Sequence, residues 1–171
     1  MSRLAALRTL AVSAGYPLFY RLPQRIRIRL VRTVSPTFTV GAVVLGRDAD
    51  EPQRLLLLRQ PPGRGWSLPA GLLARGESPV DGALRELAEE SGIRVDPARL
   101  RQADPHALVH HRGRWVDLVF EATVPAATTP LTVDGAEVLE AAWHRQSHLP
   151  ALTRSTAHLL SHYGIGPWAP R

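Results

Sequence analysis

Hydrophobic residues in the first half of the chain gather in two apolar runs separated by polar residues. Residues 38–45 (FTVGAVVL) are rich in β-branched side chains, and residues 54–59 (RLLLLR) are apolar between two arginines. Both runs have the length and composition of buried strands. The segment between them, residues 47–52 (RDADEP), is typical of a turn. We therefore expect a hairpin or a neighbouring pair of strands.

The second half of the chain predicts three further strands and a closing helix. Residues 107–111 and 115–124 form a strand pair joined at residues 112–114, where a glycine favours a hairpin loop. Residues 137–143 follow as the last strand, with Val138 and Ala142 directed inward. Residues 151–163 carry leucines and alanines at helical spacing and predict a helix.

Between these halves, residues 79–91 predict an amphipathic helix of about three and a half turns. Val80, Leu84 and Leu87 recur at positions i, i+4 and i+7 and form its buried stripe. Ser78 has the side chain of an N-cap, and Pro79 suits the first helical position because its missing N–H costs nothing there. Gly92 ends the helix as a glycine at the C-terminus commonly does.

Composition places the chain among single-domain globular proteins. Its 171 residues suffice for one core, and no apolar run approaches the ~20 residues that span a bilayer. The sequence contains no cysteine, which excludes disulfides, thiolate metal sites and thiol nucleophiles. The absence of cysteine fits a cytoplasmic protein, which is the location we expect.

The positive charge is concentrated at the N-terminus. Residues 1–35 carry seven arginines and no acid (+7), whereas the remaining 136 residues carry 14 arginines and 15 acids (14 − 15 = −1). We interpret residues 1–35 as a basic, mainly helical extension, with Pro23 in the first turn of a short helix, and residues 36–171 as the functional domain. We favour an extension packed on its own domain or on a partner subunit. Docking on acidic lipid or nucleic acid is the alternative.

The polar face of the predicted helix is unusual, because Glu86, Glu89 and Glu90 fall within about one third of its circumference. Three carboxylates so close together repel one another, and only Arg85, four residues before Glu89, is placed to relieve them. A solvated acidic face is the ordinary explanation of such a cluster. A hard divalent cation with oxygen ligands would also resolve the conflict.

The spacing around these carboxylates decides between the two explanations. Gly71 is followed after five residues by Glu77, and after seven more by Arg85 and Glu86; Leu87, Glu89, Glu90, Gly92 and Ile93 complete the series. This stretch resembles the signature of the Nudix hydrolases, G-x5-E-x7-R-E-U-x-E-E-x-G-U, where U is a bulky aliphatic residue. Residues 66–71 (WSLPAG) also resemble the family's W-x-L-P-G-G, with Ala70 in place of a glycine.

The resemblance implies a fold, a cofactor and a set of site residues. The fold would be α/β, an α/β/α sandwich with a mixed sheet, and the cofactor Mg²⁺ or Mn²⁺. Its ligands would be Glu86, Glu89, Glu90 and the backbone carbonyl around Ala70 and Gly71. Arg85 would pair with Glu77 and orient the loop. The general base would be one of Glu89, Glu90 and a later loop glutamate, for which we prefer Glu137 to Glu140.

The resemblance does not identify the substrate among the small diphosphates, which include nucleotides and other organic diphosphates. Basic side chains outside the signature are the candidates for substrate binding: Arg59, Arg64, His110 and Arg112. Trp66, Trp115 and Trp143 could stack on a base, although core packing is the commoner role of such residues. The sequence does not decide whether the protein forms a homodimer.

Two other functions are compatible with the same fold. A non-catalytic sensor would bind a nucleotide and regulate a partner, but such domains usually lose their signature carboxylates, which this chain keeps. A diphosphate isomerase would use a catalytic cysteine, which this chain lacks. Hydrolysis of a diphosphate linkage is therefore the function that we expect.

Overall fold

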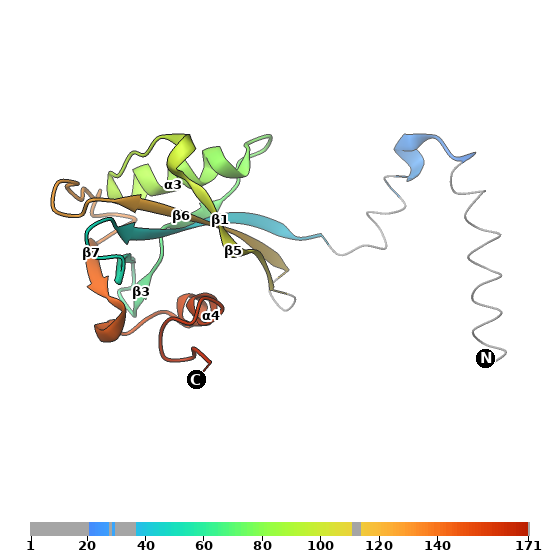
Figure 1. Ribbon diagram of the computed structural model, residues 1–171. Coiled ribbons are helices and arrows are strands. Elements are labelled where there is room, and N and C mark those ends of the chain that lie inside the picture. The colour runs from blue at the N-terminus through green and yellow to red at the C-terminus, as the bar shows by residue number, and fades with distance from the viewer. Residues whose placement is uncertain (1–20, 28, 30–36, 111–113, 171) are drawn as a thin grey trace, which may run out of the picture. The chain divides into compact units, whose positions relative to one another are not determined.

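The computed structural model describes residues 21–27, 29, 37–110 and 114–170. The chain divides into two units, Met1–Phe38 and Thr39–Arg171 (Figure 1). In the first unit residues 24–27 form a helical turn, in which the amides of Ile26 and Arg27 donate to the carbonyl of Pro23. The rest of the basic extension lies almost wholly outside the described residues, so its helical character stays a prediction. No helix in the described ranges is long and apolar enough to cross a membrane.

The second unit is built on a mixed seven-stranded sheet with β1 at its centre. The strands are β1 (Thr39–Asp48), β2 (Arg54–Arg59), β3 (Trp66–Ser67), β4 (Ala70–Leu72), β5 (Arg101–His110), β6 (Trp115–Val124) and β7 (Glu140–Arg145). The order is β3-β2-β1-β6-β5, with β4 also paired to β1 and β7 to β2. β1 and β6 are parallel over their full length, and the other pairs are antiparallel. The mixed sheet expected from the sequence is thus confirmed.

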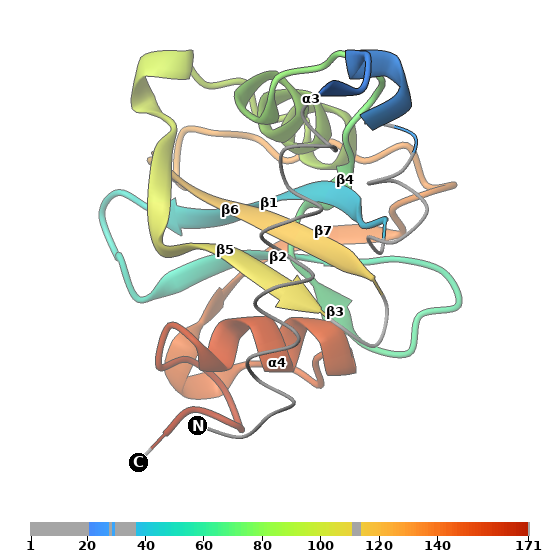
Figure 2. The same ribbon diagram turned by 90° about the vertical axis from the view of Figure 1, so that its right-hand side faces the viewer.

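Helices cover both faces of this sheet. α3 (Pro79–Ser91) lies on one face and α4 (Arg154–Ser161) on the other (Figures 1 and 2). Alternating residues of β1 supply the two cores: Val44 packs in the cluster that contains Ala83 and Leu87 of α3, and Val43 packs in the cluster that contains Leu159 of α4. β2 has four consecutive buried leucines because both of its faces are covered. The sandwich follows from strands that are apolar on both sides.

Several element boundaries differ from the sequence expectation; β1 ends at Asp48 and not at residue 45, β7 at Arg145 and not at residue 143, and α4 at Ser161 and not at residue 163. β5 begins at Arg101 and not at residue 107, and its register with β6 shifts between Gln102 and Ala107. Pro105 lies inside that shift. Because a proline cannot donate a hydrogen bond within a sheet, the sequence did not predict the first half of this strand. β7 begins at Glu140 and not at residue 137. α4 begins at Arg154 and not at residue 151, because Thr153 is its N-cap.

Candidate active site

α3 forms where its sequence predicts and presents the glutamates of the signature. The side chain of Ser78 accepts a hydrogen bond from the amide of Asp81 (3.1 Å), which caps the first turn. At the other end Gly92 adopts φ 77°, a left-handed conformation that favours glycine. The predicted bounds, residues 79–91, are confirmed. The buried residues of the helix include Leu87 and Glu90, while Glu86 lies against Gly71 of β4 and the Glu89 side chain is 62% exposed.

Arg85 lies at the centre of this acidic surface. Its Nε donates to Glu77 Oε1 (2.8 Å), and its Nη1 donates to Glu86 Oε1 (2.7 Å) and to Glu89 Oε2 (3.0 Å). Its Nη2 donates to Glu77 Oε2 (3.1 Å) and to the carbonyl of Leu72 (3.1 Å). The Arg85 guanidinium holds the pKa of the Glu77 carboxyl down at about 2. One guanidinium thus ties the loop after β4 to the helix.

Glu86 and Gly71 are in direct contact. A Cβ atom added to Gly71 would overlap the Glu86 carboxylate. Because Gly71 has no side chain, α3 can bring this carboxylate against the backbone of β4. A side chain at Gly71 would therefore displace the end of the Glu86 side chain.

Glu90 points into the protein and is 7% exposed. Its Oε2 accepts a hydrogen bond from the amide of Ala70 (2.8 Å), and its Oε1 accepts one from the side chain of Gln60. Burial raises the pKa of the Glu90 carboxyl to about 7, against the lowering effect of these hydrogen bonds. The negative charges of Glu86 and Glu137 raise that pKa further.

Glu137 lies in a loop and not in a strand. The side chain of Asp134 accepts hydrogen bonds from the amides of Ala136, Glu137 and Val138 (3.0–3.1 Å). This turn keeps residues 135–138 out of β7 and leaves the Glu137 side chain exposed. Glu140, the other candidate base, instead accepts two hydrogen bonds from Arg59 (2.8 and 3.0 Å).

The oxygen donors of this surface fit a hard cation in kind. The Pro69 carbonyl accepts a hydrogen bond from Val44 of β1, and the Gly71 carbonyl faces Gly41 of β1. Successive carbonyls of a strand point in opposite directions, so the Ala70 carbonyl points away from β1, as does that of Leu72. Within the described part of the chain, however, no three Asp, Glu or His side chains are arranged to hold a metal ion together. Arg85 bonds both Glu86 and Glu89.

The described members of the predicted substrate-binding set have different surroundings. Arg59 is paired with Glu140, and Arg64 is exposed in the loop before β3. His110 bonds Asp117 (2.9 Å) at the end of the β5–β6 pair. Arg112 lies outside the described residues.

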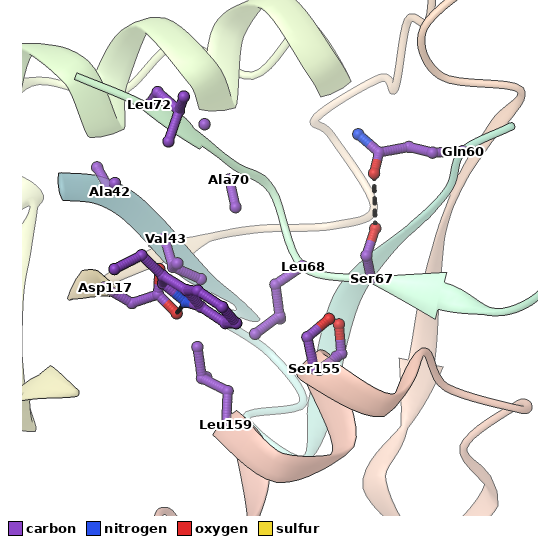
Figure 3. Close-up of a pocket in the computed structure, with 14 residues that line it drawn as sticks. Ala42, Val43, Gln60, Ser67, Leu68, Ala70, Leu72, Asp117, Ser155 and Leu159 are labelled. Atoms are coloured by element: carbon purple, nitrogen blue, oxygen red, sulfur yellow. Dashed lines mark hydrogen bonds between the residues drawn. The ribbon is translucent and has the colours of Figure 1, made fainter. Parts of the chain in front are cut away.

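A cavity of about 360 Å³ opens beside β4 on the face that carries α4 (Figure 3). Ala70 and Gln60, which both bond Glu90, line one part of it, and Trp115 and Asp117 line another. Apolar walls come from Val43, Leu68 and Leu159. Sequence reasoning missed Gln60 and Asp117, because neither belongs to the signature. The sequence signal for Asp117 was an acidic residue between apolar neighbours in a predicted strand.

The chain is similar to known proteins. A model of the NUDIX domain matches residues 36–163. The human 8-oxo-dGDP phosphatase NUDT18 is 34% identical over 125 residues, which are 70% of this chain and 36% of that protein. The putative mutator protein MutT4 of Mycobacterium tuberculosis is 41% identical over 135 residues, which are 77% of this chain and 54% of that protein.

A solved structure agrees with these sequence relatives. The NUDIX domain of Shewanella oneidensis NrtR, in complex with ADP ribose, superposes with a TM-score of 0.61 at 16% identity, over 83% of this chain and 97% of that one. At this identity the likeness shows the fold. The chain spans about a third of the length of NUDT18 and about half that of MutT4.

Proposed function

The chain belongs to the Nudix family, and we propose that it hydrolyses a diphosphate linkage in a nucleoside diphosphate derivative or another small organic diphosphate, with Mg²⁺ or Mn²⁺ as cofactor. The observation that carries this proposal is the set of contacts around Arg85 and Glu90. All four glutamates of the signature are present, and each bonds Arg85 or the backbone of β4. The phosphatase activity in the name of NUDT18 supports the same chemistry.

The proposed metal ligands are Glu86, Glu89, Glu90 and the backbone carbonyls of Ala70 and Gly71. Of the two carbonyls, that of Ala70 is the better candidate, because it points away from β1 while that of Gly71 faces Gly41. A bound divalent cation would neutralise phosphoryl oxygens and lower the pKa of a water molecule.

The protein's own groups would position the substrate and accept the proton. The oxygen of a water molecule forms a bond to one phosphorus, and the bond from that phosphorus to the bridging oxygen breaks. The proton of the water passes to a carboxylate, for which we propose Glu137, with Glu89 and Glu90 as the alternatives. Glu77 and Arg85 hold the loop and orient the carboxylates. Two phosphorylated products leave.

A panel of diphosphates assayed with Mg²⁺ or Mn²⁺ tests this function. We expect release of a phosphorylated product from at least one compound, strict dependence on the added metal, and a loss of 100-fold or more in kcat for Glu90→Gln. Glu51→Gln is the matched control, since Glu51 lies in the turn between β1 and β2 and pairs with Arg145. If no compound turns over and Glu90→Gln leaves ligand binding unchanged, the hydrolase assignment falls and a binding module takes its place.

The N-terminal division is a separate proposal. We infer that residues 36–171 carry the activity and that residues 1–35 are a basic extension of it. Removal of residues 1–35 should leave kcat unchanged, and light scattering of both forms would show whether the extension sets the oligomeric state. A tenfold loss of kcat on removal would instead make the extension part of the site.

A further inference from the structure

Two exposed histidines lie side by side at the C-terminal end of α4. His158 is in the last turn, and His162 follows it by four residues with helical dihedral angles (φ −67°, ψ −18°). Residues four apart are neighbours on the surface of a helix. The two imidazole rings are in contact, with centroids 5.2 Å apart. Neither ring is hydrogen-bonded to any residue that the structure describes, so their nitrogens are available to a ligand.

The separation of these two rings suits a shared metal ion. Two imidazoles on one tetrahedral Zn²⁺, with Zn–N distances of about 2.0–2.1 Å, have ring centres roughly 5 Å apart. The rings of His158 and His162 already have that separation. A cation is also favoured at this position, because the C-terminal end of a helix carries a partial negative charge.

A third histidine, His110 at the end of β5, lies beside the pair. Its ring centroid is 6.1 Å from that of His158. Its Nε2 bonds Asp117 Oδ2 (2.9 Å), and because an ionised carboxylate can only accept, Nε2 donates and the neutral ring keeps its lone pair at Nδ1. No described residue bonds Nδ1, and Nδ1 is not among the buried nitrogen atoms that lack a partner. This nitrogen is therefore accessible to an ion.

The surroundings of His110 are those of a metal ligand. A histidine that binds a metal usually donates its other ring N–H to a carboxylate, which orients the ring and raises its basicity. Asp117 is in that position. Trp115 stacks on the other side of the interaction, with its ring centroid 4.5 Å from that of His110 and an interplanar angle of 19°. The His110 ring is thus held in place before any ion binds.

We propose that His158 and His162 bind Zn²⁺, or another divalent transition-metal ion that prefers imidazole, and that His110 supplies a third ligand, so that the ion joins α4 to β5. In the described ranges no three such side chains already stand in metal-ligand geometry, so the rings of His158 and His162 must turn. Both are exposed and have no hydrogen bond to lose. The signature glutamates take no part in this site, because oxygen ligands suit Mg²⁺ and imidazole suits Zn²⁺, Cu²⁺ and Ni²⁺.

Calorimetric titration of Zn²⁺ into the full chain, purified without a polyhistidine tag and kept in excess Mg²⁺, tests this site. The Mg²⁺ occupies carboxylate ligands and competes poorly for imidazole. We expect His158→Ala and His162→Ala each to weaken Zn²⁺ binding at least tenfold. His148→Ala is the matched control, because His148 is also exposed but bonds the neighbouring Ser147. Absence of Zn²⁺ binding, or wild-type affinity in both α4 variants, would overturn the inference.

Two further variants test whether the ion joins α4 to β5. His110→Asn removes the third imidazole, and Asp117→Asn removes the carboxylate that orients it. We expect each to weaken Zn²⁺ binding about tenfold, which is the usual scale for the loss of a group that orients a metal ligand. Circular dichroism checks that the variants are folded. Wild-type affinity in both would place the ion on α4 alone and overturn the link to β5.

Discussion

The carboxylate of Glu86 occupies the space that a side chain at Gly71 would need. The contact joins the strand β4 to the helix α3. A methyl group at this position would displace the Glu86 carboxylate, which also accepts a hydrogen bond from Arg85 (2.7 Å).

Gly71→Ala should therefore lower kcat at least 100-fold while the protein stays folded. Steady-state kinetics on a diphosphate, together with circular dichroism, would check this. Glu51→Gln, in the turn between β1 and β2, is the control. If Gly71→Ala retains more than a tenth of the activity, the position of Glu86 against β4 does not matter for the reaction.

Arg85 makes five hydrogen bonds through its three nitrogens, so its geometry matters as well as its charge. A lysine keeps the charge but cannot reach Glu77, Glu89 and the Leu72 carbonyl together. We expect Arg85→Lys to lose at least tenfold in kcat, close to the loss in Arg85→Ala. Kinetics of both variants check this expectation. A lysine variant with wild-type kcat would show that only the charge is needed.

The sequence predicted the elements whose causes are local. The helix α3 has its cap at Ser78 and its end at Gly92, and both lie within the stretch that forms it. β2 was predicted with its observed bounds, because a short run of four leucines between arginines is typical of a buried strand. The pair Arg85–Glu77 followed from the family signature, and its geometry is as expected.

Contacts between distant residues could not be predicted in the same way. Gln60 bonds Glu90 from 30 positions away, and that bond depends on how the loop after β2 crosses the end of α3. Asp117 acquires its partners only when β5 and β6 pair. Such residues are brought together by the fold, and their spacing in the sequence does not predict the contact.

Gln60 links the cavity to Glu90 and gives a further prediction. Its Nε2 donates to Glu90, and its Oε1 accepts from the hydroxyl of Ser67 (3.2 Å). Gln60→Leu removes the donor that orients Glu90, so we expect kcat to fall about tenfold with KM nearly unchanged. Ser67→Ala removes only the group that orients Gln60 and should cost about threefold in kcat. A change confined to KM in both variants would place Gln60 in substrate binding instead.

Asp48 should make the stability of the protein depend on acid pH. It is 2% exposed at the end of β1 and accepts hydrogen bonds from the amides of Ala126 (3.0 Å) and Asp50 (3.2 Å) and from Arg54 Nη1 (3.0 Å). The bond from Ala126 is the main cause that lowers the pKa of Asp48; burial opposes it, and the bond from Asp50 and the charge of Arg54 add to the lowering. A lowered pKa in the folded state stabilises the protein above the unfolded-state pKa, which is about 3.9 for aspartate. That stabilisation is lost as the pH falls through the lower, folded-state value.

Asp48→Asn should therefore destabilise the protein at pH 7 by about 2 kcal/mol, the usual scale for hydrogen bonds to a charged group. The difference from the wild type should shrink as the pH falls below about 4, because the wild-type aspartate then loses its charge as well. Urea unfolding at pH 7, 5 and 3 measures both effects. Asp104→Asn, on the exposed part of β5, should show neither. If the difference in unfolding free energy between Asp48→Asn and wild type does not depend on pH, the shape of the Asp48 side chain, and not its charge, stabilises this end of β1.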